Sequence, residues 1–282
     1  MNILITGRDG QLGSELQELA KSSGYNFVFV GSKDGDITNK NMIRKLVSTN
    51  NINAIINCAA YTAVDKAETD KEMAFRVNGE GVQNLVEVCS ESNCKLIHIS
   101  TDYVFPGNGT SPYKTNDPVA PLGVYGASKL AGEEAILNSD IQGIIIRTSW
   151  VYSTFGHNFV KTMIRLGKEK DSLLVVNDQR GCPTYAKDLA ETCLALIDKE
   201  WKAEKRIYHY SNAGEITWFD FATKIMEMTG SNCKVTPVPS SQFPTPAKRP
   251  SYSVMDTSDL KNDFGIEPRN WKFALQECIS QL

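Results

Sequence analysis

The sequence predicts a doubly wound α/β fold, in which helices cover both faces of a parallel sheet, with a smaller C-terminal lobe. Short apolar runs alternate with longer amphipathic segments through the first half of the chain. Such alternation builds right-handed βαβ units with parallel, buried strands. The 282 residues also suggest about two domains, at roughly 150 residues per domain. We assign residues 1–150 to the sheet domain, with about 183–212 returning to it, and residues 151–282 mainly to the lobe.

Each expected element follows from a local pattern. The apolar runs predict the strands Asn2–Thr6, Asn26–Val30, Ala54–Cys58, Lys95–Ile99 and Gly143–Arg147. Apolar residues at helical spacing predict helices over Leu12–Ser22, Met42–Thr49, Glu72–Ser92 and Val124–Asn138. After Trp150 we expect helices over Asn158–Lys168, Lys187–Asp198 and Trp218–Thr229, a charged exposed stretch over Lys199–Lys205, and a strand over Ile207–Ser211. Residues 235–250 are rich in proline, which predicts a rigid loop.

The composition is that of an ordinary globular protein. Apolar residues make up 41% and charged residues 22%, and 30 Lys plus Arg against 33 Asp plus Glu leave a net charge of −3. Without a basic excess, we expect neither a nucleic-acid nor a membrane-surface partner. The apolar runs are far shorter than the roughly 20 residues of a membrane span, and no signal peptide is expected. The seven scattered cysteines predict reduced thiols in a cytoplasmic protein, without a zinc site.

Glycines follow the first strand at the spacing used for dinucleotides. Gly7, Gly10 and Gly13 permit a tight turn, close approach of the backbone to a pyrophosphate, and close packing of helix on strand. The helix that begins here offers its free N–H groups to phosphates, which indicates a Rossmann-type cofactor site. The residues expected to contact the cofactor lie in this loop and after the next two strands: Gly7, Arg8, Gly10, Gln11, Leu12, Gly13, Lys33, Asp36, Ile37, Cys58, Ala59, Ala60 and Tyr61.

The end of the second strand bears on the choice of nicotinamide dinucleotide. An acid there holds a ribose 2′-hydroxyl, whereas a cation favours a 2′-phosphate. The strand runs into Gly31-Ser32-Lys33, and we expect Lys33 and Arg8 to reach such a phosphate. NADPH is therefore the expected cofactor. The alternative is NADH, in which case the Asp34 carboxylate would bind the two hydroxyls of the adenosine ribose. We expect Asp36 and Ile37 to flank the adenine ring.

A tyrosine and a lysine one turn apart open the helix in the middle of the chain. Tyr125 and Lys129 share a helix face because residues i and i+4 are neighbours. Carbonyl reduction by hydride leaves an alkoxide that needs a proton, and a phenol of pKa about 10 is a weak donor near pH 7. An ammonium at about 4 Å would lower that pKa by up to about 3. Thr101 ends a strand and can bind the substrate carbonyl, although turn hydroxyls and exposed Tyr/Lys pairs produce similar patterns.

Longer segments around these residues resemble one family. The segments NCAAYTAVD (57–65), STDYVF (100–105) and RTSWVY (147–152) resemble the extended short-chain dehydrogenases/reductases, and among them the dTDP-4-dehydrorhamnose reductases. Further matching segments extend the resemblance from residue 3 to about 253: Ile5–Gly13, Asp36–Thr38, Tyr125–Lys129, Asp178-Gln179, Pro183-Thr184 and Pro246–Ser253.

The resemblance implies reduction of the C4 keto group of dTDP-4-dehydro-L-rhamnose by NAD(P)H, the last step of dTDP-rhamnose biosynthesis for surface polysaccharide. It implies that Tyr125 donates the proton, that Lys129 lowers the pKa of Tyr125 and holds the nicotinamide ribose, and that Thr101 binds the C4 carbonyl. Tyr125 and Lys129 thus also contact the cofactor. The residues expected to bind the dTDP-linked sugar are Thr101, Asp102, Tyr125, Trp150, Asn158, Lys248 and Arg249. Among them, Trp150 is the expected flat partner of the nucleotide sugar, and Lys248 and Arg249 are the expected partners of its diphosphate.

One position departs from the family pattern. Some members are described as dimers that share a magnesium ion between an acid at the position of Glu15 and another after the Pro-Thr motif. Lys187 occupies the second position here, and its ammonium would repel a divalent cation. We therefore expect no metal site, and both a monomer and a homodimer remain open.

Other functions share part of this pattern. Nucleotide-sugar epimerases and dehydratases have the same glycines and Tyr/Lys pair, but the dehydratases carry an acid where this chain has Tyr103. Another nucleotide-sugar 4-ketoreductase would keep most of the motifs. A non-catalytic nucleotide-binding regulatory subunit on the same fold would be expected to lose Tyr125 or Lys129, and both are present.

Overall fold

The computed structural model describes residues 1–202 and 206–282. Its main feature is a six-stranded parallel sheet with the strand order β10-β5-β4-β3-β1-β2. The strands are β1 (Asn2–Thr6), β2 (Asn26–Val30), β3 (Ala54–Asn57), β4 (Lys95–Thr101), β5 (Gly143–Thr148) and β10 (Ile207–His209). The predicted doubly wound parallel sheet is confirmed.

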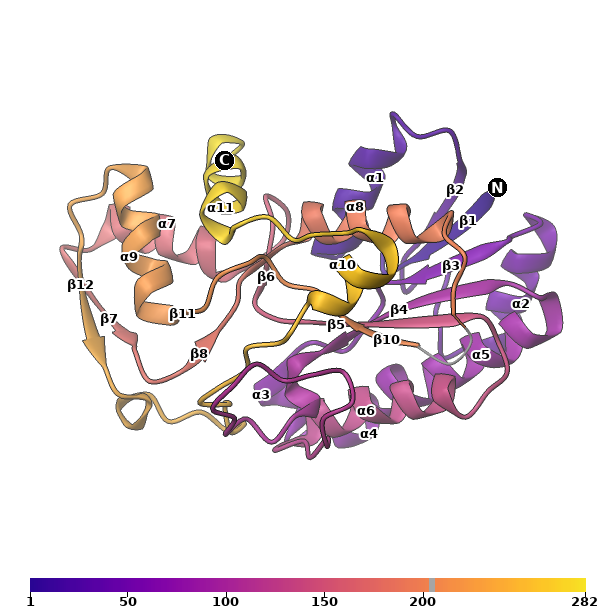
Figure 1. Ribbon diagram of the computed structural model, residues 1–282, viewed down its shortest axis with the longest axis horizontal. Coiled ribbons are helices and arrows are strands. Elements are labelled where there is room, and N and C mark those ends of the chain that lie inside the picture. Colours follow the sequence, from indigo (N-terminus) through magenta and orange to yellow (C-terminus); the bar gives the residue numbers. More distant parts are fainter. Residues whose placement is uncertain (203–205) are drawn as a thin grey trace.

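Helices cover both faces of this sheet (Figure 1). One face carries α1 (Gln11–Ala20) and α8 (Ala186–Ile197), and the other carries α2 (Lys40–Thr49), α5 (Gly81–Ser92) and α6 (Val124–Leu137). Successive residues of a strand point to opposite faces. Accordingly Ile3 and Ile5 of β1 lie in the core beneath α1, whereas Leu4 lies in the core beneath α2 and α5.

The helix predicted over Glu72–Ser92 is continuous but irregular. It consists of α4 (Lys71–Phe75), a π-helical turn η1 (Arg76–Glu80) and α5. π turns insert an extra residue and are frequent at functional sites. This one presents the buried side chain of Asn78 to the end of β3 and to α6.

The chain returns to the sheet after entering the lobe. Helix α8 packs against α1, and β10 extends the sheet by pairing with β5. Both elements lie within residues 183–212. Helix α10 (Ser258–Phe264) then packs near β10.

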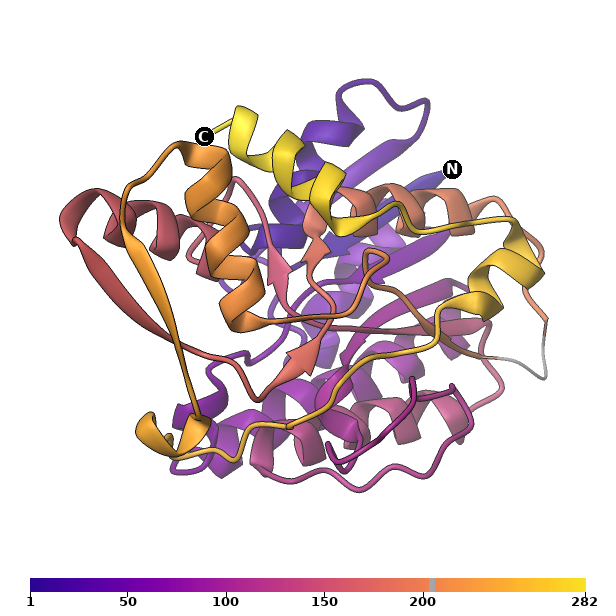
Figure 2. The same ribbon diagram turned by 60° about the vertical axis from the view of Figure 1, so that its left-hand side comes forward.

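The lobe lies to one side of the large sheet (Figure 2). Its core is formed by α7 (Phe159–Glu169), α9 (Trp218–Thr229) and α11 (Trp271–Ser280). Three two-stranded sheets surround these helices: β6 (Val151–Tyr152) with β9 (Thr184–Tyr185), β7 (Ser172–Val176) with β12 (Lys234–Val238), and β8 (Arg180–Gly181) with β11 (Ile216–Thr217).

The expectation that residues 235–250 form only a loop is wrong at its beginning. Residues Lys234–Val238 form β12, which pairs in parallel with β7 and includes Pro237. A proline removes one backbone donor, and an edge strand tolerates this because one of its sides forms no ladder. The following residues form a short 3₁₀ turn, η3 (Ser240–Gln242), and an irregular segment.

Part of the stretch Lys199–Lys205, which is predicted to be charged and exposed, is not described: residues 203–205 lie outside the described residues. Among the helices that are described, none is both long enough and apolar enough to span a membrane.

Candidate active site

The glycine loop lies between β1 and α1, where the strand order reverses and α/β proteins bind ligands. Gly7 has φ +66°, and a Cβ there would lie 2.6 Å from the Ala59 nitrogen. A Cβ on Gly13 would lie 2.3 Å from the Gly7 carbonyl oxygen. Within the described chain, no side chain caps α1 at its N-cap residue, Gly10. The free N–H groups of α1 and the close backbone approach therefore fit a pyrophosphate.

The exposed end of this site contains an ion pair. Arg8 Nη1 donates to Asp34 Oδ2 at 2.6 Å and to the Phe29 carbonyl at 3.2 Å. Asp34 also accepts from the Gly31 N–H, and these bonds lower the pKa of its carboxyl. Lys33 is exposed beside this pair. The structure thus brings Arg8 to the end of β2, where it is paired with Asp34.

Asp36 and Ile37 follow in an Asx turn. Asp36 Oδ1 accepts from the Thr38 N–H and hydroxyl, both at 2.9 Å. The Ile37 side chain is buried and packs in the core against Gly81. Asp36 remains partly accessible, whereas the Ile37 side chain serves the core.

The segment after β3 is fixed by buried polar side chains. The Thr6 hydroxyl donates to Asn57 Oδ1 at 2.6 Å, and Asn57 Oδ1 accepts from the Ala59 N–H at 3.2 Å. Asn78 accepts from the Tyr61 N–H at 2.9 Å and donates to the Tyr61 carbonyl and to the Ser128 hydroxyl. These bonds join the turn at residues 58–61 to α6. The structure therefore brings Cys58, Ala59, Ala60 and Tyr61 to the same strand edge as the glycine loop.

Thr101, Tyr125 and Lys129 lie together at β4 and the start of α6. Tyr125 forms a side-chain hydrogen bond with Thr101, and its ring contacts Tyr103 edge to face at 5.5 Å between centroids. Lys129 is 2% exposed, and its Nζ donates to the Ile99 carbonyl at 2.6 Å. Lys129 Nζ also lies 3.3 Å from His98 Nε2. The half-buried phenol of Tyr125, the buried hydroxyl of Thr101 and the buried Lys129 side chain thus share one corner of the structure.

The prediction that Lys129 lowers the pKa of Tyr125 is wrong for this arrangement. Burial raises the pKa of Tyr125, and the hydrogen bond with Thr101 offsets only part of the rise. Burial also lowers the pKa of Lys129 from 10.5 to about 8. The cause is desolvation, which disfavours both phenolate and ammonium, while the Lys129 ammonium is directed at the Ile99 carbonyl. Tyr125 therefore keeps its proton at neutral pH.

Asp102, in the same corner, is another group whose pKa is shifted by burial. It is 3% exposed, and burial raises the pKa of its carboxyl to about 6, despite hydrogen bonds with Ser253 and Thr101 that lower it. The Thr101 hydroxyl donates to Asp102 Oδ1 at 3.0 Å. Asp102 therefore positions the Thr101 side chain beside Tyr125.

A buried ion pair anchors α6 one turn beyond Lys129. Arg147 Nη2 and Glu133 Oε2 lie 2.6 Å apart, with side chains 2% and 0% exposed. Glu133 also accepts from the Ser100 hydroxyl at 2.5 Å, and the Arg147 guanidinium lies over the Phe105 ring. Breaking such a pair would leave an uncompensated buried charge. The pair thus fixes α6 to β4 and β5, and fixes Lys129 with it.

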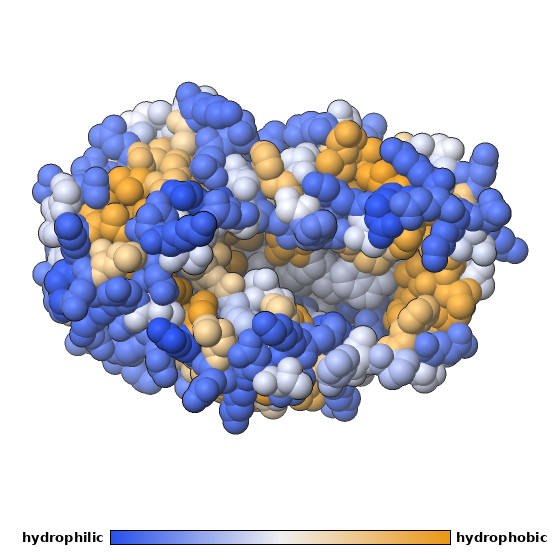
Figure 3. Space-filling view, turned by 180° about the vertical axis from the view of Figure 1, so that it is seen from behind, coloured by the Kyte–Doolittle hydropathy of each residue, from blue (hydrophilic) through white to orange (hydrophobic). Residues whose placement is uncertain are grey.

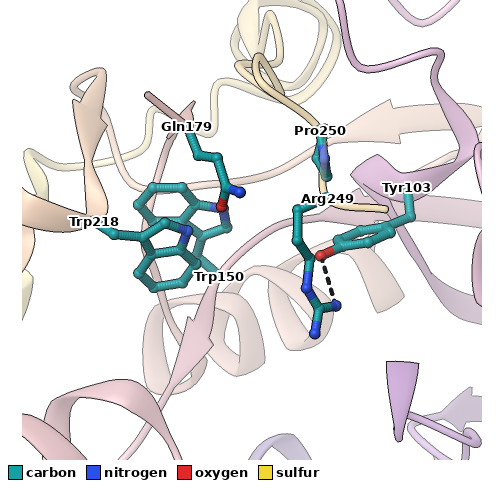
Figure 4. A pocket seen from close by; sticks show the side chains of 6 residues that line it. All are labelled: Tyr103, Trp150, Gln179, Trp218, Arg249 and Pro250. Carbon is teal, nitrogen blue, oxygen red and sulfur yellow. Dashed lines mark hydrogen bonds between the residues drawn. The ribbon is translucent and has the colours of Figure 1, made fainter. Parts of the chain in front are cut away.

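A cavity of about 270 Å³ opens beside this corner, toward the lobe. It is lined by Tyr103, Trp150, Gln179, Trp218, Arg249 and Pro250 (Figure 4). The Trp150 and Trp218 indoles stack with centroids 3.6 Å apart, and Trp150 has a strained positive φ of 48°. Seen from behind, the molecule is hollowed across the middle, with mostly hydrophilic residues around the hollow (Figure 3).

The other expected substrate residues lie elsewhere. Lys248 is exposed on the segment that leads to Arg249. Asn158 caps α7 by accepting from the Lys161 N–H, and its amide donates to Gln11 Oε1 at 3.0 Å. Asn158 therefore connects the lobe to the glycine loop rather than lining the cavity.

Comparisons with known proteins agree on one family. The family model described as the RmlD substrate binding domain matches residues 1–282. The chain belongs to the dTDP-4-dehydrorhamnose reductase family. It is 40% identical over 284 residues to the dTDP-4-dehydrorhamnose reductase of Aggregatibacter actinomycetemcomitans, with 97% of each chain covered. The resemblance found in the sequence is confirmed.

Solved structures agree with this membership. The crystal structure of a dTDP-4-dehydrorhamnose reductase from Clostridium acetobutylicum is 41% identical with a TM-score of 0.95, covering 100% of this chain and 99% of that one. The dTDP-4-dehydrorhamnose reductase of Bacillus anthracis, in complex with NADP, is 38% identical with a TM-score of 0.95 at the same coverage.

The magnesium site described for some family members does not fit these residues. Glu15 is buried and accepts from the Ser153 hydroxyl at 2.6 Å, and burial raises the pKa of its carboxyl. Lys187 Nζ lies 2.5 Å from Glu277, and Arg269 bridges Glu277 and Asp188. Glu277 and Asp188 are thus paired with cations of the same chain. Among the described residues, no cluster of His, Cys, Asp and Glu is arranged for a metal.

Three residues that line or support this candidate site are not singled out by the sequence patterns. Asn78 acts through a π turn that helical periodicity does not reveal. Trp218 begins a helix of the lobe and meets Trp150 only through tertiary packing. Asp65, at the end of the NCAAYTAVD segment, binds Arg249 across the cavity rim. Asp65 belongs to a segment that matches the family, which indicates that the residue matters. Its partner Arg249 lies far along the chain, so the sequence does not predict the contact.

Proposed function

We propose that this chain reduces the C4 keto group of dTDP-4-dehydro-L-rhamnose to dTDP-L-rhamnose, the last step of dTDP-rhamnose biosynthesis for surface polysaccharide. Membership of the reductase family over the whole chain supports this activity. The observation that carries the proposal is the meeting of Thr101 and Tyr125 beside the buried Lys129. Tyr103, at the position where dehydratases carry an acid, favours reduction over dehydration.

We propose NADPH as the preferred cofactor, with NADH as a weaker substitute. The glycine loop would hold the pyrophosphate, and Arg8 with Lys33 would face a 2′-phosphate at the exposed end. The NADP bound to the Bacillus anthracis relative supports this assignment. When bound, NADPH supplies the hydride that reaches C4.

The proton is proposed to come from Tyr125. Because burial keeps the phenol protonated, it can donate to the strongly basic oxygen that forms at C4. Thr101, oriented by Asp102, would bind the same oxygen and align the carbonyl. The Lys129 ammonium, which donates to the Ile99 carbonyl, would hold the nicotinamide ribose through its remaining N–H donors.

The nucleotide part of the substrate is proposed to occupy the cavity toward the lobe. Trp150 and Trp218 offer flat apolar surfaces, and Arg249 offers charge-assisted N–H donors to the diphosphate. Lys248 would contribute its charge from the rim. This placement leaves the sugar ring between Arg249 and Tyr125.

The assay that tests this function supplies dTDP-4-dehydro-L-rhamnose and follows the absorbance of NADPH and NADH in separate reactions. Stoichiometric oxidation of NADPH, with dTDP-L-rhamnose identified by NMR, is the expected result. Interconversion of sugars without net oxidation would indicate an epimerase or dehydratase. Nucleotide binding without any turnover would indicate the regulatory alternative.

We also propose that the protein works in the cytoplasm. All seven cysteines are free thiols, and six of them are buried. Reduced thiols are typical of proteins in a reducing compartment. Fractionation of the producing cell, with the activity recovered in the cytoplasmic fraction, would test this.

A further inference from the structure

A short helix joins the two sides of the proposed substrate site. Helix α3 (Val64–Ala67) and its C-cap residue Glu68 lie between α6 and the strap, which we define as residues 239–250. Asp65 binds the strap, and Glu68 binds the first turn of α6. The two carboxylates are three residues apart and therefore lie on neighbouring positions of one helical turn.

Asp65 holds the Arg249 guanidinium in place. Arg249 Nη2 donates to Asp65 Oδ2 at 2.6 Å, and the Ala247 N–H donates to Asp65 Oδ1 at 3.2 Å. On its other side, Arg249 Nη1 lies 3.2 Å from the Tyr103 hydroxyl (Figure 4). A guanidinium has five N–H donors, so donors remain for an anion in the cavity that Arg249 lines.

Glu68 supplies the cap that α6 lacks in its own sequence. The N-cap residue of α6 is Gly123, which has no side chain to accept from the helix. Glu68 Oε1 accepts from the Val124 N–H at 2.9 Å instead, and its negative charge suits a helix N-terminus. A Cβ on Gly123 would lie 2.5 Å from this oxygen, and one on Gly126 would lie 2.2 Å from the Tyr103 carbonyl. The turn that carries Tyr125 is thus fixed on both sides.

We propose that Asp65 and Glu68 are positioning residues that set the separation between the diphosphate-binding group and the proton donor. Asp65 orients Arg249 toward the diphosphate, and Glu68 orients the turn that carries Tyr125. A 4-keto sugar carries its diphosphate at C1 and its reacting carbonyl at C4, on opposite sides of a rigid ring. Arg249 and Tyr125 must therefore stand at a defined separation. One short helix with its C-cap residue contacts the Arg249 side chain and the first turn of the helix that carries Tyr125. This inference rests on the proposed function.

Substitutions of Asp65 and of Glu68 test the two parts of the proposal separately. Asp65→Asn is expected to raise the KM for the dTDP-4-keto sugar and the calorimetric Kd for dTDP about tenfold, with kcat and the Kd for NADPH within about twofold, because the charged partner of Arg249 is lost. Glu68→Ala is expected to lower kcat roughly tenfold without changing the Kd for dTDP, because the donor is misplaced. Glu68→Gln keeps an acceptor for Val124 and is expected to restore kcat to within about twofold.

The matched control is Glu91→Gln, which breaks an ion pair with Arg44 of similar length and exposure far from the site. The Arg44–Glu91 pair measures 2.7 Å with side chains 41% and 44% exposed, against 2.6 Å, 24% and 41% for Arg249–Asp65. Kinetic and binding constants of Glu91→Gln are expected to match the wild type.

A double-mutant cycle completes the test. In an Arg249→Met background, Asp65→Asn is expected to have no further effect on the Kd for dTDP, because its action runs through Arg249. The proposal is overturned if Asp65→Asn leaves dTDP binding unchanged, if its effect persists without Arg249, or if Glu68→Gln loses as much kcat as Glu68→Ala. Calorimetry with dTDP needs no turnover, so a failure of the proposed reaction would appear separately, as a wild-type protein that binds dTDP but reduces nothing.

Discussion

The two ends of the proposed cofactor site differ in their exposure to water. At the inner end, Lys129 is 2% and Asp102 is 3% exposed, and burial moves the pKa of Lys129 down to about 8 and that of Asp102 up to about 6. At the outer end, the side chains of Arg8 and Asp34 are 35% and 47% exposed, and Lys33 is exposed as well. The proposed chemistry is thus placed where water is excluded, and the proposed phosphate recognition is placed where water remains.

The two ends are therefore expected to differ in how much free energy is lost when a charged or polar side chain is substituted. Two charges at about 4 Å interact by about 1 kcal/mol in water and about 4 kcal/mol at an effective dielectric of about 20. Removing a group from the inner end is therefore expected to cost more than removing one from the outer end. Four experiments, ordered by the size of the expected effect, test this contrast.

Tyr125→Phe is expected to have the largest effect. It removes the proposed proton donor at the inner end, and kcat should fall at least about 100-fold, the lower range for general acid catalysis. The Kd values for NADPH and dTDP should stay within about twofold. Turnover close to that of the wild type would exclude Tyr125 as the acid, and steady-state kinetics beside calorimetry makes the measurement.

Asp102→Asn tests how much the ionised, buried carboxylate of Asp102 lowers the free energy of unfolding. The pKa of Asp102 is about 6 in the folded chain against 3.8 when unfolded, so its stabilising contribution is complete below pH 3.8 and is lost as the pH rises through 6. Relative to the variant, the wild type should lose about 2 kcal/mol of unfolding free energy between pH 4 and pH 7. Urea unfolding at both pH values measures this, and parallel pH curves for the two proteins would contradict it.

The pH dependence of cofactor binding tests Lys129. Its pKa is lowered to about 8, so the ammonium is lost as the pH rises above 8, and binding of the anionic NADPH should weaken about tenfold between pH 7 and pH 9. The control is Lys129→Met, whose Kd should be weaker throughout and flat over that range. A wild-type Kd that does not change with pH would exclude this role for the ammonium. Fluorescence titration with NADPH is suitable.

Lys33→Asp is expected to have the smallest effect. The side chain is exposed, so water and salt screen its charge. Preference for NADPH over NADH, measured as the ratio of kcat/KM values, should fall about threefold to fivefold, and less in high salt. Lys45→Asp, an exposed lysine on α2, should leave the ratio unchanged. An unchanged ratio in Lys33→Asp would mean that Lys33 does not contact the phosphate.

The limits of the sequence are clearest in the lobe. Strands β1 to β5 are rich in apolar residues, and the sequence predicts each of them to within a residue or two of its observed bounds. Strands β6, β8, β9 and β11 contain two residues each, too few for any periodicity. β12 contains Pro237, which normally argues against a strand. Such elements exist because a partner from elsewhere in the chain lies beside them.

The sequence by itself determined the doubly wound sheet, the glycine loop after β1, and the Tyr125/Lys129 pair on one helix face, because alternation, glycine spacing and the i, i+4 relation are local properties. Only the tertiary structure decided the electrostatic state of Lys129, the stacking of Trp150 on Trp218, and the contact of Asp65 with Arg249. Each of these depends on burial or on a partner distant along the chain. Desolvation and long-range contacts arise only when the whole chain packs, and no local pattern carries them.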